Sequence, residues 1–68
     1  MSWKYGILKT GNTYQVCEVY MNFDHGEANT GAVTPMGETK QELLLDLIRM
    51  ANDVAQDIHE GRCIEEES

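Results

Sequence analysis

Cysteine, proline and basic residues are scarce in this sequence, and long hydrophobic segments are missing. Its 68 residues include two cysteines, one proline and five Lys or Arg. No apolar run approaches the ~20 residues of a membrane-spanning helix, and the segment after Lys4 lacks the apolar stretch of a signal peptide. Two cysteines are too few for the disulfide framework of a small secreted domain. We therefore expect a soluble cytoplasmic protein that is not exported and binds no membrane.

Acidic side chains outnumber basic ones, since five Lys or Arg stand against 12 Asp or Glu and give a net charge of −7. Affinity for nucleic acid depends largely on Lys and Arg that displace phosphate counterions. We therefore expect no nucleic-acid partner, and a basic protein surface fits this charge better. The last ten residues carry −3 of the total, with four glutamates against Arg62.

The chain is short enough to form only one domain. A domain of this size buries about 60% of the surface that its unfolded chain exposes, so its margin of stability is small. We predict a single domain over residues 1–60 and an acidic, disordered tail over residues 61–68. The predicted fold class is α+β, with the plan β-β-β-α: a three-stranded antiparallel meander followed by one long amphipathic helix.

Two segments rich in β-branched and aromatic residues, 3–9 and 13–21, predict a pair of strands. Gly11 and Asn12 between them suit a tight turn, so the strands should form a hairpin. The register depends on the length of the loop, and two lengths remain open. With a two-residue loop, one face holds Trp3, Tyr5, Ile7, Val16, Glu18 and Tyr20. With a three-residue loop, the first three of these share their face with Cys17, Val19 and Met21.

A polar stretch at residues 22–31 predicts a connection, with Gly26 and Gly31 at its turns. A short third strand is predicted at residues 32–34. Pro35 ends that strand, because proline cannot donate a hydrogen bond to a strand ladder.

Residues 39–42 predict the start of a helix. The Thr39 hydroxyl can accept from the backbone N–H of Glu42 while the Glu42 carboxylate reaches back to the N–H of Thr39, which makes a capping box. Apolar residues then recur at helical spacing, and Gly61 suits the C-terminal stop. The predicted helix covers residues 40–60.

The apolar residues of this helix form two neighbouring stripes. The first consists of Leu44, Ile48, Ala51, Ala55 and Ile58. The second consists of Leu43, Leu47, Met50 and Val54. One helix covers one face of a small sheet, so apolar surface is left over, and a two-fold dimer is the commonest way to bury it. The residues expected at this interaction surface are Trp3, Tyr5, Tyr14, Val16, Tyr20, Leu43, Leu47, Met50 and Val54.

The polar residues do not form a catalytic pattern. The sequence has no Ser-His-Asp or Cys-His arrangement and no Gly-rich phosphate loop, so we expect no enzyme activity and no cofactor. One pair with the spacing of metal ligands is His59 and Cys63. A loop group that could bind a metal is Asp24, His25 and Glu27. Neither supplies the four ligands of structural zinc, so no metal site is predicted. The expected function is a non-enzymatic protein–protein interaction module that acts as a homodimer.

The pattern Trp3-x-Tyr5-x-Ile7, then Glu18-Val19-Tyr20, then Thr34-Pro35-x-Gly37-Glu38-Thr39 resembles a family of small uncharacterised bacterial proteins. The resemblance extends from Trp3 to about Met50. It implies the plan of three strands and a helix, and no assigned activity. The helix of this chain continues to His59, where shorter members of the family stop, so the resemblance implies nothing about the C-terminal end.

The same plan, with Gly37-Glu38-Thr39 and Glu42 opening an amphipathic helix, is similar to the partial RNase H-like domain of HicB-type antitoxins. In those proteins a small acidic domain neutralises a small basic ribonuclease toxin. This resemblance implies an alternative function as an antitoxin domain with a basic protein partner. The sequence shows no DNA-binding segment of the kind that many such antitoxins add, so no autoregulation is implied.

Overall fold

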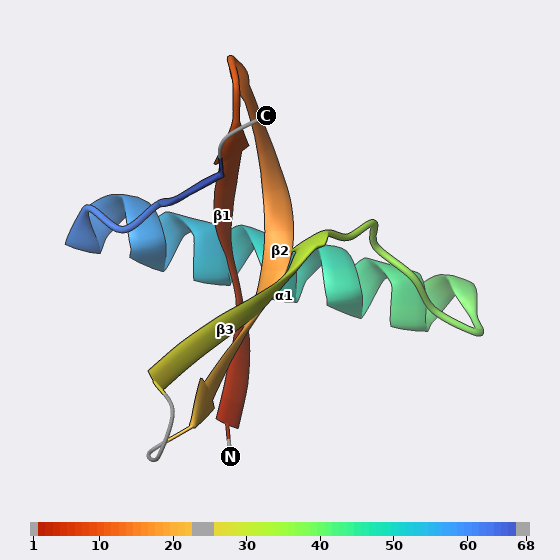
Figure 1. Ribbon diagram of the computed structural model, residues 1–68. Helices are drawn as coiled ribbons and strands as arrows, with labels where there is room; N and C mark the ends of the chain where they lie inside the picture. The colour runs from red at the N-terminus through yellow and green to blue at the C-terminus, as the bar shows by residue number, and fades with distance from the viewer. Residues whose placement is uncertain (1, 23–25, 67–68) are drawn as a thin grey trace.

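The computed structural model describes residues 2–22 and 26–66. Along the chain its elements are β1 (Ser2–Thr10), β2 (Thr13–Asn22), β3 (Gly26–Ala32), α1 (Lys40–Glu60) and β4 (Ile64–Glu66). The strands form one sheet in the order β3-β2-β1-β4 (Figure 1). β1 is antiparallel to β2 and parallel to β4, so the sheet is mixed. The α+β class is confirmed, and β1, β2 and β3 form an antiparallel meander, but the prediction of only three strands is wrong because β4 adds a fourth, parallel one.

β1 and β2 form the predicted hairpin with a two-residue loop. Thr10 pairs with Thr13, and Gly11 between them has a φ of 60°. A positive φ at the first loop position is typical of a type II′ turn, whose twist matches that of the strands. The observed register therefore selects the two-residue alternative. One side of the hairpin, which we call the aromatic face, carries Trp3, Tyr5, Ile7, Lys9, Tyr14, Val16, Glu18 and Tyr20.

The third strand lies earlier in the chain than predicted. β3 occupies Gly26–Ala32, where the sequence pattern indicated a connection, and the strand predicted at residues 32–34 is wrong. The hydrophobic pattern of the sequence did not indicate this strand, because β3 lies at the edge of the sheet. Exposed residues of such a strand, such as Asn29, need not be apolar. Gly31, with a φ of 82°, lies at a bulge that shifts the register of β3 against β2.

Residues assigned to the predicted tail form the fourth strand. Leu8 lies opposite Ile64 in the parallel pairing of β1 with β4. Ile64 packs against the buried cluster of Leu8, Cys17 and Val19, which gives β4 its apolar anchor. One apolar residue among glutamates shows no strand alternation, so the pattern could not indicate this strand. Residues 67–68 lie outside the described residues.

α1 begins and ends as predicted. The Thr39 hydroxyl oxygen accepts from the N–H of Glu42 at 3.0 Å, and the Glu42 carboxylate accepts from the N–H of Thr39 at 3.2 Å. Gly61 has a φ of 71° at the C-cap, a left-handed backbone that favours glycine. The helix predicted over residues 40–60 is therefore confirmed.

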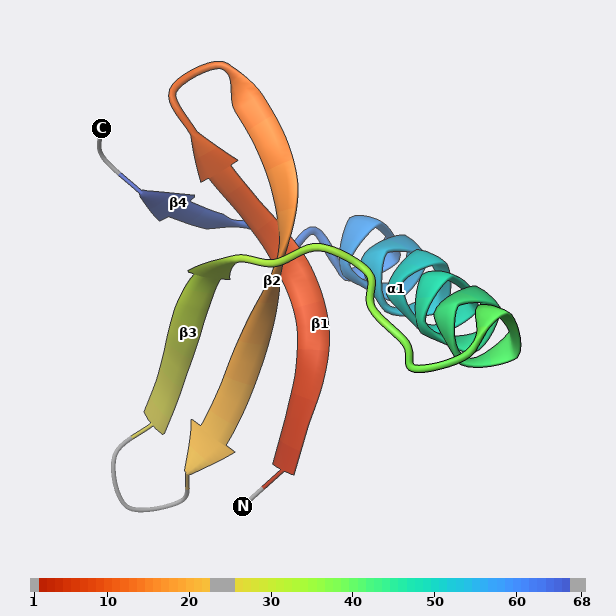
Figure 2. The ribbon, with the colours of Figure 1, turned by 90° about the vertical axis from the view of Figure 1, so that its right-hand side faces the viewer.

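α1 lies against the edge of β1 and not over a face of the sheet. Figure 1 shows the helix crossing the strands at a steep angle, and Figure 2 shows it beside β1. The backbone N–H of Tyr5 donates to Asp53 Oδ2 at 3.0 Å. Because an edge strand leaves backbone groups unpaired, the helix supplies the acceptor that a neighbouring strand would supply. β4 occupies the edge of β1 further along, from Leu8 onward.

The buried core is small and includes a close approach between helix and strand. Its buried hydrophobic residues are Tyr5, Leu8, Cys17, Val19 and Met50. A β-carbon at Gly6, in the middle of β1, would lie 2.8 Å from Val19 Cγ2 and 3.3 Å from Asp57 Oδ2. Glycine at this position therefore allows α1 to approach the strand.

We expect Gly6→Ala to lower the free energy of unfolding by about 1–3 kcal/mol, because the added methyl group forces Val19 or Asp57 aside. Urea unfolding followed by circular dichroism measures the change. Ser2→Ala, at an exposed position of the same strand, is the control and should change stability by less than about 0.5 kcal/mol. A Gly6→Ala protein as stable as the unchanged one would contradict the close approach.

Candidate functional site

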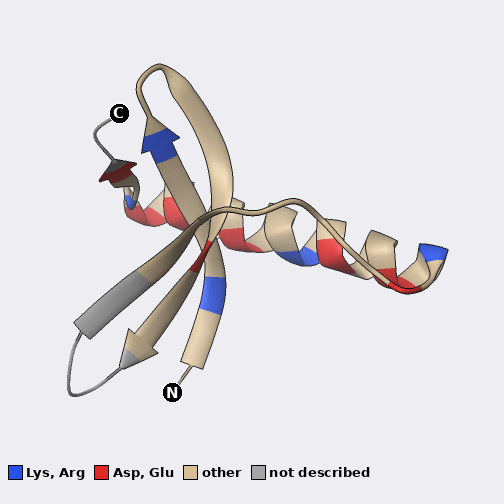
Figure 3. Cartoon of the chain, turned by 45° about the vertical axis from the view of Figure 1, so that its right-hand side comes forward, with Lys and Arg blue, Asp and Glu red and all other residues tan. Residues whose placement is uncertain are grey.

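The side of α1 that meets the sheet is acidic. Three aspartates on this side, Asp46, Asp53 and Asp57, all accept hydrogen bonds from β1. Figure 3 shows that acidic residues recur along the helix. Asp57 is only 4% exposed, and its partner is the ammonium group of Lys4. Since a buried carboxylate without a partner is strongly destabilising, this ion pair allows the acidic side to face the strand.

Tyr5 is held by two of these aspartates, through its backbone by Asp53 and through its hydroxyl by Asp46. Asp46 also accepts from the backbone N–H of Met36 at 2.9 Å. Burial, together with the hydrogen bond and the charge of Asp46, raises the pKa of Tyr5 from 10.0 to about 12. The hydrogen bonds from Tyr5 and Met36 lower the pKa of Asp46. A neutral tyrosine and a charged aspartate, the states that this bond requires, are therefore both favoured.

Arg49 and Trp3 extend the contact between α1 and the aromatic face. The Arg49 guanidinium lies 4.1 Å from the centre of the Trp3 ring, within cation–π distance. The Trp3 ring meets the Tyr5 ring edge-on at 5.2 Å and the tilted Tyr20 ring at 6.4 Å. These aromatic side chains therefore contribute to packing within the chain.

The opposite side of α1 is aliphatic and faces solvent. We name this surface the outward stripe, and it consists of Leu44, Ile48, Ala51, Ala55 and Ile58. All five residues are exposed, with 57% of Leu44, 46% of Ile48 and 69% of Ile58 accessible. Their spacing of four, three, four and three residues is that of a coiled-coil seam, and no charged residue lies among them. The helix is thus amphipathic in the reverse of the usual sense, since its acidic side faces the sheet.

The nine residues predicted for the interaction surface lie in different environments. Two are buried: Tyr5 and Met50. Four are half-buried: Trp3, Val16, Tyr20 and Val54. Three are exposed: Tyr14, Leu43 and Leu47. The outward stripe is not among the nine, because the contacts that turn the opposite row of aspartates to β1 join distant residues and leave no local signal in the sequence.

An apolar groove of about 510 Å³ adjoins the C-terminal half of the outward stripe. It lies between the helix and the hairpin. Its aliphatic lining is Ile7, Val16, Val54 and Ile58, and Tyr14, Gln15, Asp57, Gly61, Arg62 and Cys63 also line it. Ile58 belongs to both the groove and the outward stripe, so the two apolar surfaces are continuous.

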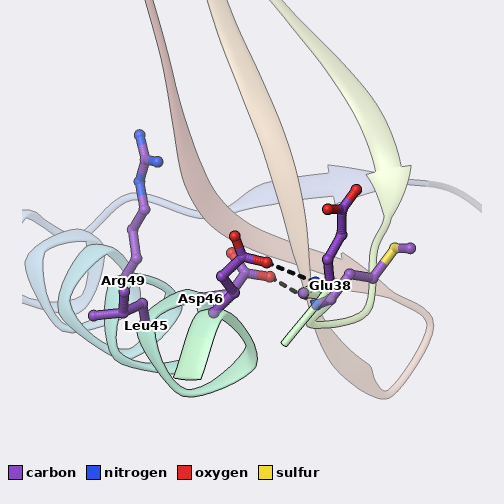
Figure 4. A pocket seen from close by; sticks show the side chains of 7 residues that line it. Glu38, Leu45, Asp46 and Arg49 are labelled. Atoms are coloured by element: carbon purple, nitrogen blue, oxygen red, sulfur yellow. Dashed lines mark hydrogen bonds between the residues drawn. The ribbon is translucent and has the colours of Figure 1, made fainter. Parts of the chain in front are cut away.

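A second hollow lies where the loop before α1 meets the first turns of the helix. Figure 4 shows its labelled residues Glu38, Leu45, Asp46 and Arg49, with dashed hydrogen bonds crossing from helix to loop. The N–H of Met36 donates to Asp46, and the N–H of Glu38 donates to the Glu42 carboxylate at 2.8 Å. These bonds attach the loop to the helix, so the polar groups of the hollow have a structural role, which is to hold the loop before α1 in place.

Within residues 2–22 and 26–66, no group of three or more His, Cys, Asp or Glu side chains is placed to hold a metal ion. Of the predicted loop group, Asp24 and His25 lie outside the described residues. Cys17 is buried and Cys63 is exposed, and both are free thiols. Burial first, and the charge of Asp57 second, raise the pKa of the Cys17 thiol, which makes it less reactive. The described part of the chain contains no helix with the length and hydropathy to span a membrane.

Comparison with protein-family models, with curated proteins and with solved structures found no match to this chain. The two resemblances drawn from the sequence pattern therefore stay predictions.

The hydrogen bond between Tyr5 and Asp46 predicts how stability depends on pH at the alkaline end. A group whose pKa is raised on folding stabilises the folded state fully below its unfolded pKa and loses that contribution as the pH rises. We therefore expect this contribution to the free energy of unfolding to disappear between pH 10.0 and about 12. Urea unfolding across this range measures it, and the stability difference between Tyr5→Phe and the unchanged protein should shrink there.

Two further variants separate the hydrogen bond from general alkaline effects. Asp46→Asn removes the neighbouring charge and lowers the pKa of Tyr5 toward its unfolded value. The contribution of Tyr5 to the free energy of unfolding should therefore be lost over a narrower pH range. Glu60→Gln alters a carboxylate whose described contacts are with Gln56 and Arg62, and it should behave like the unchanged protein. If the free energy of unfolding of Tyr5→Phe fell with pH as steeply as that of the unchanged protein, Tyr5 would not be the source of this pH dependence.

Proposed function

We propose that this protein is a small, non-enzymatic interaction module that acts as a homodimer, with the outward stripe of α1 as its contact. The reversed orientation of α1 carries this proposal. A surface helix ordinarily turns its apolar side to the core, whereas here the aliphatic side is exposed from Leu44 to Ile58. Because both cysteines are free thiols, we also propose a cytoplasmic location.

Covering the outward stripe removes a large apolar surface from water. Burying a whole Leu or Ile side chain contributes about 1.5–3 kcal/mol, so a half-exposed one offers about 1 kcal/mol. Leu44, Ile48 and Ile58 are exposed to about this degree, and so is the neighbouring Leu47 at 44%. In a two-fold dimer every such contact occurs twice. A contact between the stripes of two copies therefore buries the most apolar surface.

A second copy of the chain suits the stripe because the stripe carries no charge. Two copies with a net charge of −7 each repel one another over most of their surfaces. Three carboxylates of α1 are turned to the sheet, where Lys4 and Tyr5 bind them. The proposed contact therefore sets aliphatic surface against aliphatic surface and keeps these carboxylates away from it.

A basic protein partner, which the resemblance to antitoxins implies, has less support. The aspartates that would attract such a partner are bonded within the fold. The outward stripe offers it no carboxylate. We therefore keep the homodimer as the proposal.

We expect the purified protein to have a mass of twice 7.7 kDa in size-exclusion chromatography with light scattering. Leu44→Glu should raise the dissociation constant at least about a hundredfold, because dimerisation would bury two unpaired carboxylates. Both proteins should retain the same circular dichroism spectrum, since Leu44 is exposed in the single chain.

Leu45→Glu is the matched control. Leu45 follows Leu44 directly and is 64% exposed against 57%, but helix geometry places it outside the outward stripe. A glutamate there lies one turn before Arg49 and should leave the dimer intact. A monomer for the unchanged protein up to millimolar concentration, or equal weakening by both variants, would overturn the proposed contact.

A further inference from the structure

We infer that two copies pair through antiparallel α1 helices, so that Leu44 and Leu47 of one copy enter the apolar groove of the other. This inference rests on the proposed function and deepens it. The outward stripe by itself allows the two helices to run in the same direction or in opposite directions. The unequal halves of the helix distinguish these two arrangements.

The two halves of α1 differ in bulk. The N-terminal half presents large exposed side chains, Leu44, Leu47 and Ile48. The C-terminal half presents the small residues Ala51 and Ala55, followed by Ile58, which lines the groove. A parallel pair would set leucine against leucine and alanine against alanine, and would leave the groove empty. An antiparallel pair sets the large residues of one copy against the small residues and the groove of the other, as close packing requires.

The position of the groove around the helix gives the same answer. Val54 lines the groove, and Leu47 lies seven residues earlier, on the same side of the helix. When the two-fold axis is perpendicular to both helices, the same lateral side of each helix lies on the same side of the interface. Leu47 of one copy therefore meets the side of the partner helix that borders the groove. When the two-fold axis is parallel to the helices, opposite lateral sides of the two helices lie on the same side of the interface. The groove of one copy then meets the side of the partner helix that does not carry Leu47. The antiparallel arrangement is therefore the one that fills the groove with leucine.

Charge favours the same arrangement. Lys40 lies four residues before Leu44, on the same side of the helix and beyond the N-terminal end of the outward stripe. The other end of the helix is Glu60, which pairs with Arg62 at 3.4 Å, and Glu65 follows. Antiparallel pairing brings the negative dipole end of one helix toward the positive dipole end of the partner helix, whereas parallel pairing sets like dipole ends side by side.

In the inferred dimer the two-fold axis passes near Ala51, where the small side chain allows the helices to approach closely. Leu44 of one copy then faces Ile58 of the partner copy, because both residues lie seven positions from Ala51. Within one helix Leu44 and Ile58 are about 21 Å apart at 1.5 Å per residue. A disulfide needs Cα atoms within about 4–7 Å, so cross-linking distinguishes the two orientations.

The test uses the full chain with Cys63→Ser, so that the remaining native thiol is the buried Cys17. Leu44→Cys and Ile58→Cys are made singly in this background, and each is checked by circular dichroism and by light scattering. The two proteins are then mixed and treated with oxidised glutathione, and the cross-linked species are identified by mass spectrometry. We expect the mixed disulfide, which joins a Leu44→Cys chain to an Ile58→Cys chain, in at least a tenfold excess over either symmetric disulfide.

Each outcome bears on one proposal. The mixed disulfide in excess supports antiparallel pairing. Symmetric disulfides of Leu44→Cys and of Ile58→Cys, from a protein that is dimeric by light scattering, overturn the antiparallel inference and leave the proposed function standing. A dimer that forms none of these disulfides also overturns the inference. A monomer in light scattering, for the unchanged protein, overturns the proposed function.

Discussion

An unpaired strand edge determines the architecture of this protein. β1 pairs with β2 along its whole length, but its other edge pairs with β4 only from Leu8 onward. The backbone N–H of Tyr5 lies on the uncovered part, and buried backbone donors need acceptors. Asp53 supplies the acceptor, while Asp46 and Asp57 bind the side chains of Tyr5 and Lys4 on either side of it. Once the acidic side of α1 faces the strand, helical geometry turns the aliphatic side to solvent.

Local signals in the sequence predicted the elements that depend on near neighbours. The capping box joins residues three positions apart, the hairpin turn depends on Gly11, and Gly61 ends the helix. Contacts between distant residues carried no such signal. Asp53 and Tyr5 are 48 positions apart, so nothing local indicated that the acidic side of the helix faces inward. β3 and β4 were missed for a related reason, since an edge strand and a three-residue strand need little hydrophobic alternation of their own.

The candidate surface was predictable in kind but not in position. A surplus of apolar residues follows from composition, because a chain of 68 residues has little interior in which to place them. The choice of which residues are left exposed depends on how the helix is oriented. Trp3 packs with Arg49 and with Tyr20 inside the chain, although the size and apolar character of the two aromatic residues favoured them as interface residues. The orientation of the helix instead exposed a stripe that ordinary amphipathic reasoning assigns to the core.

The pairing of β1 with β4 has a consequence for synthesis on the ribosome. β1 is translated first, but the part of its edge beyond Leu8 stays open until Ile64 has emerged. α1, whose capping contacts are local, can form earlier than that. The sheet therefore still lacks its fourth strand at the stage when the helix can first form. The last strand to be translated covers the edge of the first, so folding of this sheet is completed only after residues 64–66 are available.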